Sequence, residues 1–303
     1  KKKYRIIFLP GDDKFDEQLF AMSSIKGNDY RNIWSYLIEG GPENGVNLLK
    51  YILYLNSGIR KPPAAKKISS VGIYYPDLNE INAETLQTKW RIKKRPVIAI
   101  TFYSALLQSG QTEVIDALIT ALEKDYNCMP IHSKSFKDKK NRDVTRFLLK
   151  KYNPISVINL TGFSLSGISS SKTIFDDARR PVFQVILSSM SEHEWQHSSK
   201  GLNNRDIIMS ISLPEIDGRI ITKTIAFKEE ISFDKITQTK LLEYIPHDFG
   251  INYICNLVKN WSKLSVTSNE KKNIFITLAN YPNKDSRIAN GVGLDTPSSI
   301  VHL

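Results

Sequence analysis

The sequence predicts an α/β protein built around a Rossmann-like parallel sheet unit with helices on both faces. Apolar runs alternate with helical segments between residues 96 and 187, at the spacing of repeated strand–helix–strand units. Hydrophobic residues make up 41% of the 303 positions and charged residues 24%, which is ordinary for a globular protein with room for about two domains. We also expect a smaller N-terminal α/β part and an antiparallel hairpin insertion.

Residues 1–61 have the pattern of the C-terminal part of an N-terminal α/β domain. The apolar run at 4–9 predicts a short buried strand that stops at Pro10, and helical periodicity follows at 32–39 and 44–56. Residues 62–95 are rich in proline and charge and are predicted to be a connector, with one strand-like run at its centre, at 71–75.

The central domain is predicted to span residues 96–270. Its expected strands are 97–102, 128–131, 156–160 and 181–187, and its expected helices are 112–125, 143–151 and 248–264. This order implies parallel strands joined by helical crossovers. The Gly-x-Gly-x-x-Gly fingerprint of dinucleotide-binding domains is missing from the sequence. Residues 207–213 and 219–227 alternate like two antiparallel strands around the turn residues 214–218, and this is the predicted hairpin.

Charge and cysteine content restrict the classes of function. The net charge is +11, which fits either a lysine-rich surface or an anionic partner. The lysine clusters are not interleaved with aromatic residues, so nucleic acid is an unlikely partner. The two cysteines favour a reducing cytoplasm over a disulfide framework. No apolar run reaches the roughly 20 residues of a membrane helix, so no membrane association is expected.

A metal-binding motif occurs in the middle of the chain. His193-Glu194-Trp-Gln-His197 matches the H-E-x-x-H pattern of zinc peptidases, and Glu215 lies downstream as a conceivable third ligand. Its predicted helix is short and flanked by serines, whereas a zinc peptidase carries the motif on a long buried helix. We therefore interpret His193 and His197 as a chance match and predict no metal site. His132, at the end of a predicted strand, is expected to be solvated.

The end of the chain has the pattern of a ligand site. A strand-like run at 273–280 leads into a polar, glycine-bearing loop at 281–297, and residues 298–302 predict the start of a helix. Open α/β sheets build ligand sites from such loops at the carboxyl ends of strands. The chain begins with Lys and stops one turn into this helix, so we expect a piece of a longer protein in which 271–303 begin a second α/β lobe.

The same terminal stretch carries a family resemblance. Residues 278–298 read Leu-Ala-Asn-Tyr-Pro-Asn-Lys-Asp-Ser-Arg-Ile-Ala-Asn-Gly-Val-Gly-Leu-Asp-Thr-Pro-Ser and closely resemble a block of the CobN/magnesium chelatase H-type family of large subunits. Further blocks resemble the family in order along the chain, at 9–13, 34–44, 71–76, 102–112, 115–118, 159–163, 201–206 and 213–220. His193 and His197 fall where the family pattern has no histidines.

The resemblance implies a cytoplasmic large subunit that binds a tetrapyrrole and receives a divalent metal. Within the family, cobaltochelatase inserts cobalt into hydrogenobyrinic acid a,c-diamide during cobalamin biosynthesis. An AAA+ ATPase and an integrin-like subunit would be the partners, and they, not this chain, would hydrolyse ATP with Mg. A fragment would be inactive alone. The alternatives left open are a non-catalytic binding or scaffold module of a magnesium chelatase H type and, less favoured, a zinc peptidase.

Candidate ligand-binding residues are the polar groups and glycines that follow predicted strands. They are Tyr103, Gln108, Thr112, Thr161, Asn280, Tyr281, Arg287, Asn290, Gly291 and Asp295. Glu215 and Asp217 are the weak candidates for a catalytic base, because removing the pyrrole protons requires one. Each residue also has an ordinary structural interpretation, such as a helix cap for Asp295 and a turn for Asp217.

Overall fold

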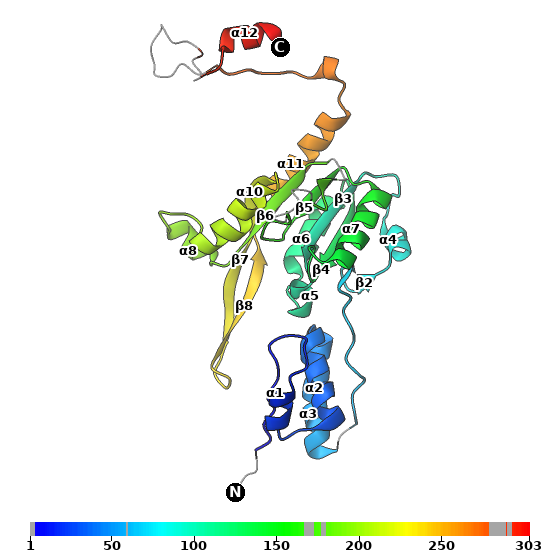
Figure 1. The fold of residues 1–303 in the computed structure, drawn as a ribbon. Coiled ribbons are helices and arrows are strands. Elements are labelled where there is room, and N and C mark those ends of the chain that lie inside the picture. Colours follow the sequence, from blue (N-terminus) through cyan, green and yellow to red (C-terminus); the bar gives the residue numbers. More distant parts are fainter. Residues whose placement is uncertain (1–3, 59, 167–172, 177–179, 279–288, 290–292) are drawn as a thin grey trace. The chain divides into compact units, whose positions relative to one another are not determined.

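The computed structural model describes residues 4–58, 60–166, 173–176, 180–278, 289 and 293–303 (Figure 1). The chain divides into two compact units, residues 1–259 and 260–303, and each is described by itself. No helix in the described ranges is both long enough and apolar enough to cross a membrane.

The N-terminal segment contains helices and no strand in its described residues. It contains α1 (Glu17–Met22), α2 (Gly27–Glu39) and α3 (Pro42–Ser57). The strand predicted at residues 4–9 is wrong, because these residues form no regular secondary structure. Their backbone bonds to the hydroxyls of Ser23 and Ser24 and to the Ser24 backbone, so no neighbouring strand pairs with them. The segment surrounds a small aromatic core that includes the buried rings of Tyr36 and Tyr51.

One sheet organises the larger unit. In the described residues it has eight strands in the order β2-β1-β4-β3-β5-β6-β7-β8. The strands are β1 (Val71–Tyr75), β2 (Asn79–Ile81), β3 (Val97–Tyr103), β4 (Asn127–Ser133), β5 (Ser156–Asn159), β6 (Val182–Ser188), β7 (Ile220–Asp234) and β8 (Thr239–Pro246). The strands from β4 to β7 in this order are parallel, as predicted for β3, β4, β5 and β6 but not for β7, and both edges of the sheet are antiparallel.

Helices cover both faces of the sheet, which also agrees with the prediction. On one face α6 (Glu113–Leu122) and α11 (Asp248–Val266) bury apolar side chains, including Leu118 and Ile254, against the central strands. On the other face α4 (Ala83–Lys89) and α7 (Lys139–Tyr152) form a second core. The predicted connector therefore contributes β1, β2 and α4, because its apolar residues find partners on the edge of the sheet.

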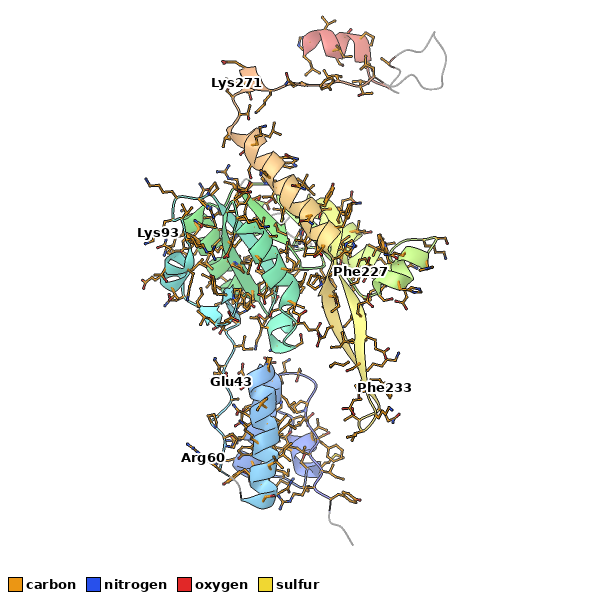
Figure 2. The ribbon with its side chains drawn as sticks, turned by 180° about the vertical axis from the view of Figure 1, so that it is seen from behind. Glu43, Arg60, Lys93, Phe227, Phe233 and Lys271 are labelled. Carbon is orange, nitrogen blue, oxygen red and sulfur yellow. The ribbon has the colours of Figure 1, made fainter. Side chains whose placement is uncertain are left out.

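The predicted hairpin has the wrong first strand. Residues 207–213 are helical and belong to a crossover that includes α8 (Glu192–His197), α9 (Asn204–Ile207), a π-helical turn at Ile208–Ser212 and α10 (Leu213–Ile216). The reason is topological, because β7 runs parallel to β6 and a parallel pair requires a crossover instead of a tight turn. The hairpin is formed instead by β7 and β8. Within β7, Phe227 is buried, whereas Phe233 near the end of the strand is 46% exposed (Figure 2).

The C-terminal unit contains the end of α11, a short 3-10 helix at Asn269–Lys271 and α12 (Thr296–His302). The helix predicted at 298–302 is confirmed. The buried strand predicted at 273–280 is wrong over its described part, 273–278, which pairs with no other described strand. Ile274 and Phe275 are 80% and 96% exposed. The last two residues of that prediction lie outside the described residues.

Candidate functional site

The order of the strands predicts where a ligand crevice would lie in this sheet. The chain leaves β3 through α6 to β4 on one side, then crosses through α7 to β5 on the other side of β3. The direction of winding therefore changes between β3 and β5. Ligands of open α/β sheets bind at such a switch point, outside the carboxyl ends of the strands. The last residue of β3 is Tyr103, and β5 ends two residues before Thr161.

The structure brings Tyr103 and Thr161 to this point, but their polar atoms serve the fold. The Tyr103 hydroxyl donates to the Gly162 carbonyl at 3.1 Å. Thr161 is fully buried, and its hydroxyl donates to Asn159 Oδ1 at 2.9 Å. Its carbonyl accepts from Asn159, Gln184 and Arg219. The hydrogens of both hydroxyls are used inside the protein, so neither hydroxyl is available to donate to a ligand.

A buried polar network lies beneath the crevice and was missed from the sequence. Asn159 accepts a bond from Thr101 at 2.7 Å and donates to Gln184 Oε1 at 2.7 Å. Arg219 also donates to Gln184 Oε1, at 2.9 Å, so the network joins β3, β5, β6 and the residue before β7. The sequence did contain a signal for this network, namely side-chain amides within apolar strands, since a buried amide must find hydrogen-bond partners.

Asp217 closes this network and holds the segment that follows β5. Its carboxylate lies 2.7 Å from Arg219 Nη2, and both side chains are 1% exposed. It also accepts bonds from the hydroxyl of Ser164 and the backbone amides of Leu165 and Ser166, at 2.6, 2.6 and 3.0 Å. Burial alone would raise the pKa of Asp217, but these donated bonds outweigh it and leave the pKa below its usual value. A carboxylate held this way is a poor proton acceptor, which argues against a catalytic base.

The other predicted carboxylate and the two histidines lie on short helical segments. Glu215 is an exposed residue of the four-residue helix α10. His193 and His197 lie on the six-residue α8, where their rings stack at 4.2 Å and His197 Nδ1 lies 2.9 Å from the His193 carbonyl. Glu194 completes a capping box with Ser191 at the start of α8. Among the described residues, no three His, Cys, Asp or Glu side chains come together as a metal site.

Gln108 and Thr112 form hydrogen bonds with elements other than β5. The Gln108 side chain donates to the Ile38 carbonyl at 3.1 Å. The backbone carbonyl of Gln108 accepts from the Gly41 amide at 2.6 Å. Gln108 therefore ties the sheet to the N-terminal helices. The Thr112 hydroxyl faces Asp116, whose carboxylate accepts a 2.6 Å bond from the Tyr74 hydroxyl. Neither residue bonds to the segment after β5.

Most of the predicted C-terminal site falls outside the described part of the chain. This holds for Asn280, Tyr281, Arg287, Asn290 and Gly291. Asp295 is described, and it caps α12 by accepting a bond from the Ser298 amide at 3.1 Å. This is the helix-cap role that its sequence context allowed.

His132 is a second buried polar side chain that sequence reasoning missed, because the expectation of a solvated side chain is wrong. It lies within β4, is fully buried, and its Nδ1 is 2.8 Å from the Ser104 hydroxyl. On its other side Nε2 lies 2.8 Å from Glu80 Oε1. Gly72 makes room for this pair, since a Cβ there would meet His132 Nε2 at 2.7 Å. Ser104 is fully buried as well, so it cannot act as a nucleophile on a bulky substrate.

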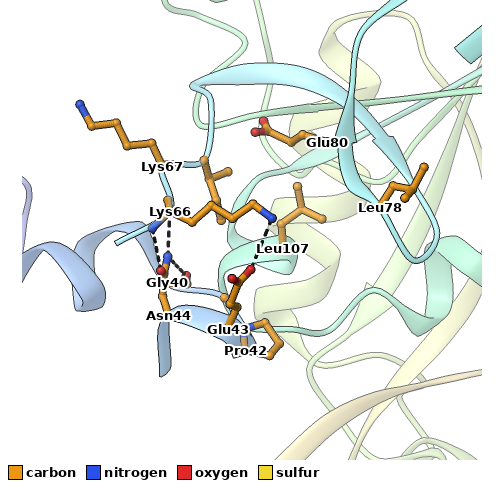
Figure 3. A pocket seen from close by; sticks show the side chains of 11 residues that line it. Gly40, Pro42, Glu43, Asn44, Lys66, Lys67, Leu78, Glu80 and Leu107 are labelled. Carbon is orange, nitrogen blue, oxygen red and sulfur yellow. Dashed lines mark hydrogen bonds and ion pairs between the residues drawn. The ribbon is translucent and has the colours of Figure 1, made fainter. Parts of the chain in front are cut away.

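Glu80 also lines a cavity between the start of α3 and the edge of the sheet (Figure 3). The cavity has a volume of about 110 Å³, and Lys66 and Glu43 form an exposed ion pair of 3.4 Å at its wall. Its other lining residues are Gly40, Gly41, Pro42, Asn44, Lys67, Ile68, Leu78 and Leu107. Sites for drug-sized ligands span roughly 300–1,000 Å³, so this cavity is too small for a macrocycle.

Comparison with known proteins now decides the family. The sequence profile of the CobN/Magnesium Chelatase family matches residues 34–303, which is most of the chain. The chain belongs to the CobN/magnesium chelatase family. The resemblance drawn from the terminal block and the collinear blocks is confirmed.

Relatives named after two kinds of chelatase match the chain. The chain is 34% identical over 311 aligned residues to the aerobic cobaltochelatase subunit CobN of a Sinorhizobium species, and covers 24% of its length. It is 30% identical to the protein of the same name from Pseudomonas aeruginosa, over 98% of this chain and 24% of that protein. The H-type magnesium-chelatase protein of Chlorobaculum parvum is 23% identical, over 92% of this chain and 22% of that protein. The chain thus spans about a quarter of these relatives.

A solved structure of the family has the same fold. The catalytic subunit of cobaltochelatase from Mycobacterium tuberculosis superimposes with a TM-score of 0.69 at 22% sequence identity. The match covers 98% of this chain and 24% of the solved one. At this level of identity the likeness concerns the fold alone.

Proposed function

We propose that the chain is part of the tetrapyrrole-binding large subunit of an ATP-dependent cobaltochelatase in the cytoplasm. The observation that carries the proposal is the 34% identity to a CobN protein over 99% of the chain. The substrate would be hydrogenobyrinic acid a,c-diamide, and cobalt would be the inserted metal. An AAA+ ATPase and an integrin-like subunit would be the partners.

Metal insertion requires three operations. The macrocycle must be held, two pyrrole N–H protons must pass to a base, and the divalent metal must exchange its water ligands for the ring nitrogens. No described carboxylate or histidine at the crevice is both accessible and free of tight structural bonds, since Asp217 is buried and tied to four groups. We therefore assign this region to holding the macrocycle, and the base and metal ligands to other parts of the subunit.

The main competing function is a binding or scaffold module without chemistry of its own, as in a magnesium chelatase H type. One observation favours this function. The hydroxyls of Tyr103 and Thr161 donate their hydrogen bonds to groups inside the protein. Such a module would grip other subunits or other domains and bind no macrocycle alone.

Titration of hydrogenobyrinic acid a,c-diamide into the purified chain separates the two functions. We expect saturable changes in the absorbance bands of the corrinoid, at a stoichiometry of about one per chain. Deuteroporphyrin, titrated in parallel, tests for the magnesium-chelatase type of substrate. If neither compound binds, macrocycle binding by this chain is contradicted and the scaffold function is favoured.

A further inference from the structure

An exposed aromatic side chain lies just after β5, at the switch point of the sheet. Phe163 follows β5 by four residues and is 46% exposed. It belongs to none of the core clusters formed by the described residues. A single exposed aromatic residue is common on protein surfaces, so its backbone and its surroundings must carry the argument.

The backbone of Phe163 adopts a conformation that side chains other than glycine rarely take. Its φ angle is +64°, in the left-handed region. A bulky residue persists there only where the surrounding structure imposes it, and such positions concentrate at ligand sites. Glycine would occupy the same conformation without strain, so the phenylalanine is present despite its backbone cost.

Hydrogen bonds from three elements impose this conformation. The Phe163 amide donates to the Met209 carbonyl of the crossover at 2.8 Å, and its carbonyl accepts from Arg219 Nη2 at 3.1 Å. The preceding Gly162 has no space for a Cβ, which would lie 2.9 Å from the Met209 carbonyl oxygen. The Gly162 carbonyl is in turn held by the Tyr103 hydroxyl of β3.

The residues after Phe163 are held as firmly as those before it. Asp217 accepts bonds from the backbone of Leu165 and from Ser164, and the same carboxylate is paired with Arg219. Arg219 thus links the Phe163 carbonyl to Asp217, the carboxylate that binds Ser164 and Leu165. The backbone that presents the exposed ring is fixed in position before any ligand arrives.

We propose that Phe163 is a binding residue that packs its ring against the apolar face of the tetrapyrrole at the switch point. This inference rests on the proposed function. A rigid aromatic side chain gives large contact area at little entropic cost, and a wide, flat macrocycle offers the matching face. The buried network of Asp217, Arg219 and Thr161 acts as the positioning support of this residue.

The test compares two exposed phenylalanines of the full chain. Phe163→Ala is matched with Phe147→Ala, since Phe147 is 61% exposed on α7, and Phe163→Tyr serves as the conservative variant. Hydrogenobyrinic acid a,c-diamide is titrated into each protein. We expect Phe163→Ala to raise the Kd about tenfold, with Phe147→Ala and Phe163→Tyr within about twofold of the parent chain.

Each result decides the matter. If the parent chain binds the corrinoid and Phe163→Ala binds it equally well, the proposed function stands and the role of Phe163 is wrong. Equal weakening by Phe163→Ala and Phe147→Ala would mean nonspecific apolar adsorption and would also overturn the role. If the parent chain does not bind the corrinoid, both the proposed function and this inference fail.

Discussion

Two ion pairs with buried members support opposite ends of the same sheet, and they differ in their access to solvent. Arg219 and Asp217 lie beside β7, where both side chains are 1% exposed. His132 and Glu80 lie at the junction of β4 with the β1–β2 edge, where the histidine is fully buried but the Glu80 side chain is 26% exposed. Each pair contributes to the lining of a cavity, but the side chains of the first pair are almost fully shielded from solvent, whereas Glu80 of the second is partly open to it.

The difference in exposure assigns different roles to the two pairs. Both terminal nitrogens of Arg219 donate to carbonyl, amide and carboxylate oxygens, while its buried Nε has no partner among the described residues, so Asp217 cannot be removed without leaving a cation in the interior. Burial lowers the pKa of Arg219, and the neighbouring Asp217 opposes this effect. The enclosed pair is a fixed support for the crevice. The pair of His132 and Glu80 is expected to be sensitive to pH, because the Glu80 carboxylate is partly exposed to solvent.

The largest effect is expected from removing the enclosed carboxylate. Asp217→Ala leaves Arg219 buried without its counter-ion, and such a loss costs about 3–5 kcal/mol of folding free energy. Urea denaturation of the two proteins measures it. The matched control is Glu230→Ala, which breaks the exposed 2.7 Å pair with Lys240 and should cost no more than about 1 kcal/mol. A loss below about 1 kcal/mol for Asp217→Ala would contradict the supporting role.

A smaller effect is expected from crowding the half-open pair. In Gly72→Ala the new Cβ would lie 2.7 Å from His132 Nε2 and 2.9 Å from Glu80 Oε1, so one side chain must shift. Overpacking of this kind costs about 1–3 kcal/mol. Gly45→Ala is the control, because it lies in α3 with open space around it and should be neutral or slightly stabilising. Equal stability of both variants, measured by thermal melting, would show that the pair tolerates movement.

The smallest effect is expected in the pH dependence of stability. Burial raises the pKa of Glu80, but His132 and the two bonds from the Ser69 amide outweigh it, so the folded pKa lies below the unfolded value. The stabilisation by Glu80 is therefore complete above the unfolded pKa of about 4.3 and is lost as the pH falls through the folded pKa. In Glu80→Gln this part of the acid sensitivity should disappear. Superimposable stability profiles for both proteins across the acid range would refute the assignment.

Strand positions were predictable wherever a run of apolar residues is buried on both sides of the sheet. The predicted strand at 71–75 coincides with β1, and the other predicted central strands fall on β3 to β6 with small shifts at their ends. The pairing partners were not predictable. Residues 207–213 contain alternating apolar residues that suit a strand, yet the parallel direction of β7 required helices there.

The candidate site was predictable only in outline. Tyr103 and Thr161 were placed at strand ends by sequence order, and the fold puts both at the switch point. Their hydrogen bonds could not be foreseen, because Asn159 and Gln184 are distant in sequence and meet only when β5 pairs with β6. His132 was misassigned for the same reason, since its partners come from β2 and from the residue after β3.

The sequence by itself determined the α/β class, the central strands and helices, and membership of the family. These depend on local periodicity and on the order of residue blocks, which require no knowledge of distant contacts. Tertiary structure alone decided that Arg219 binds the Phe163 carbonyl, that Glu80 faces His132, and that an ordinary phenylalanine is held in a left-handed conformation. Those features arise from residues far apart in the chain, which meet only when the strands pair and the crossovers pack against the sheet.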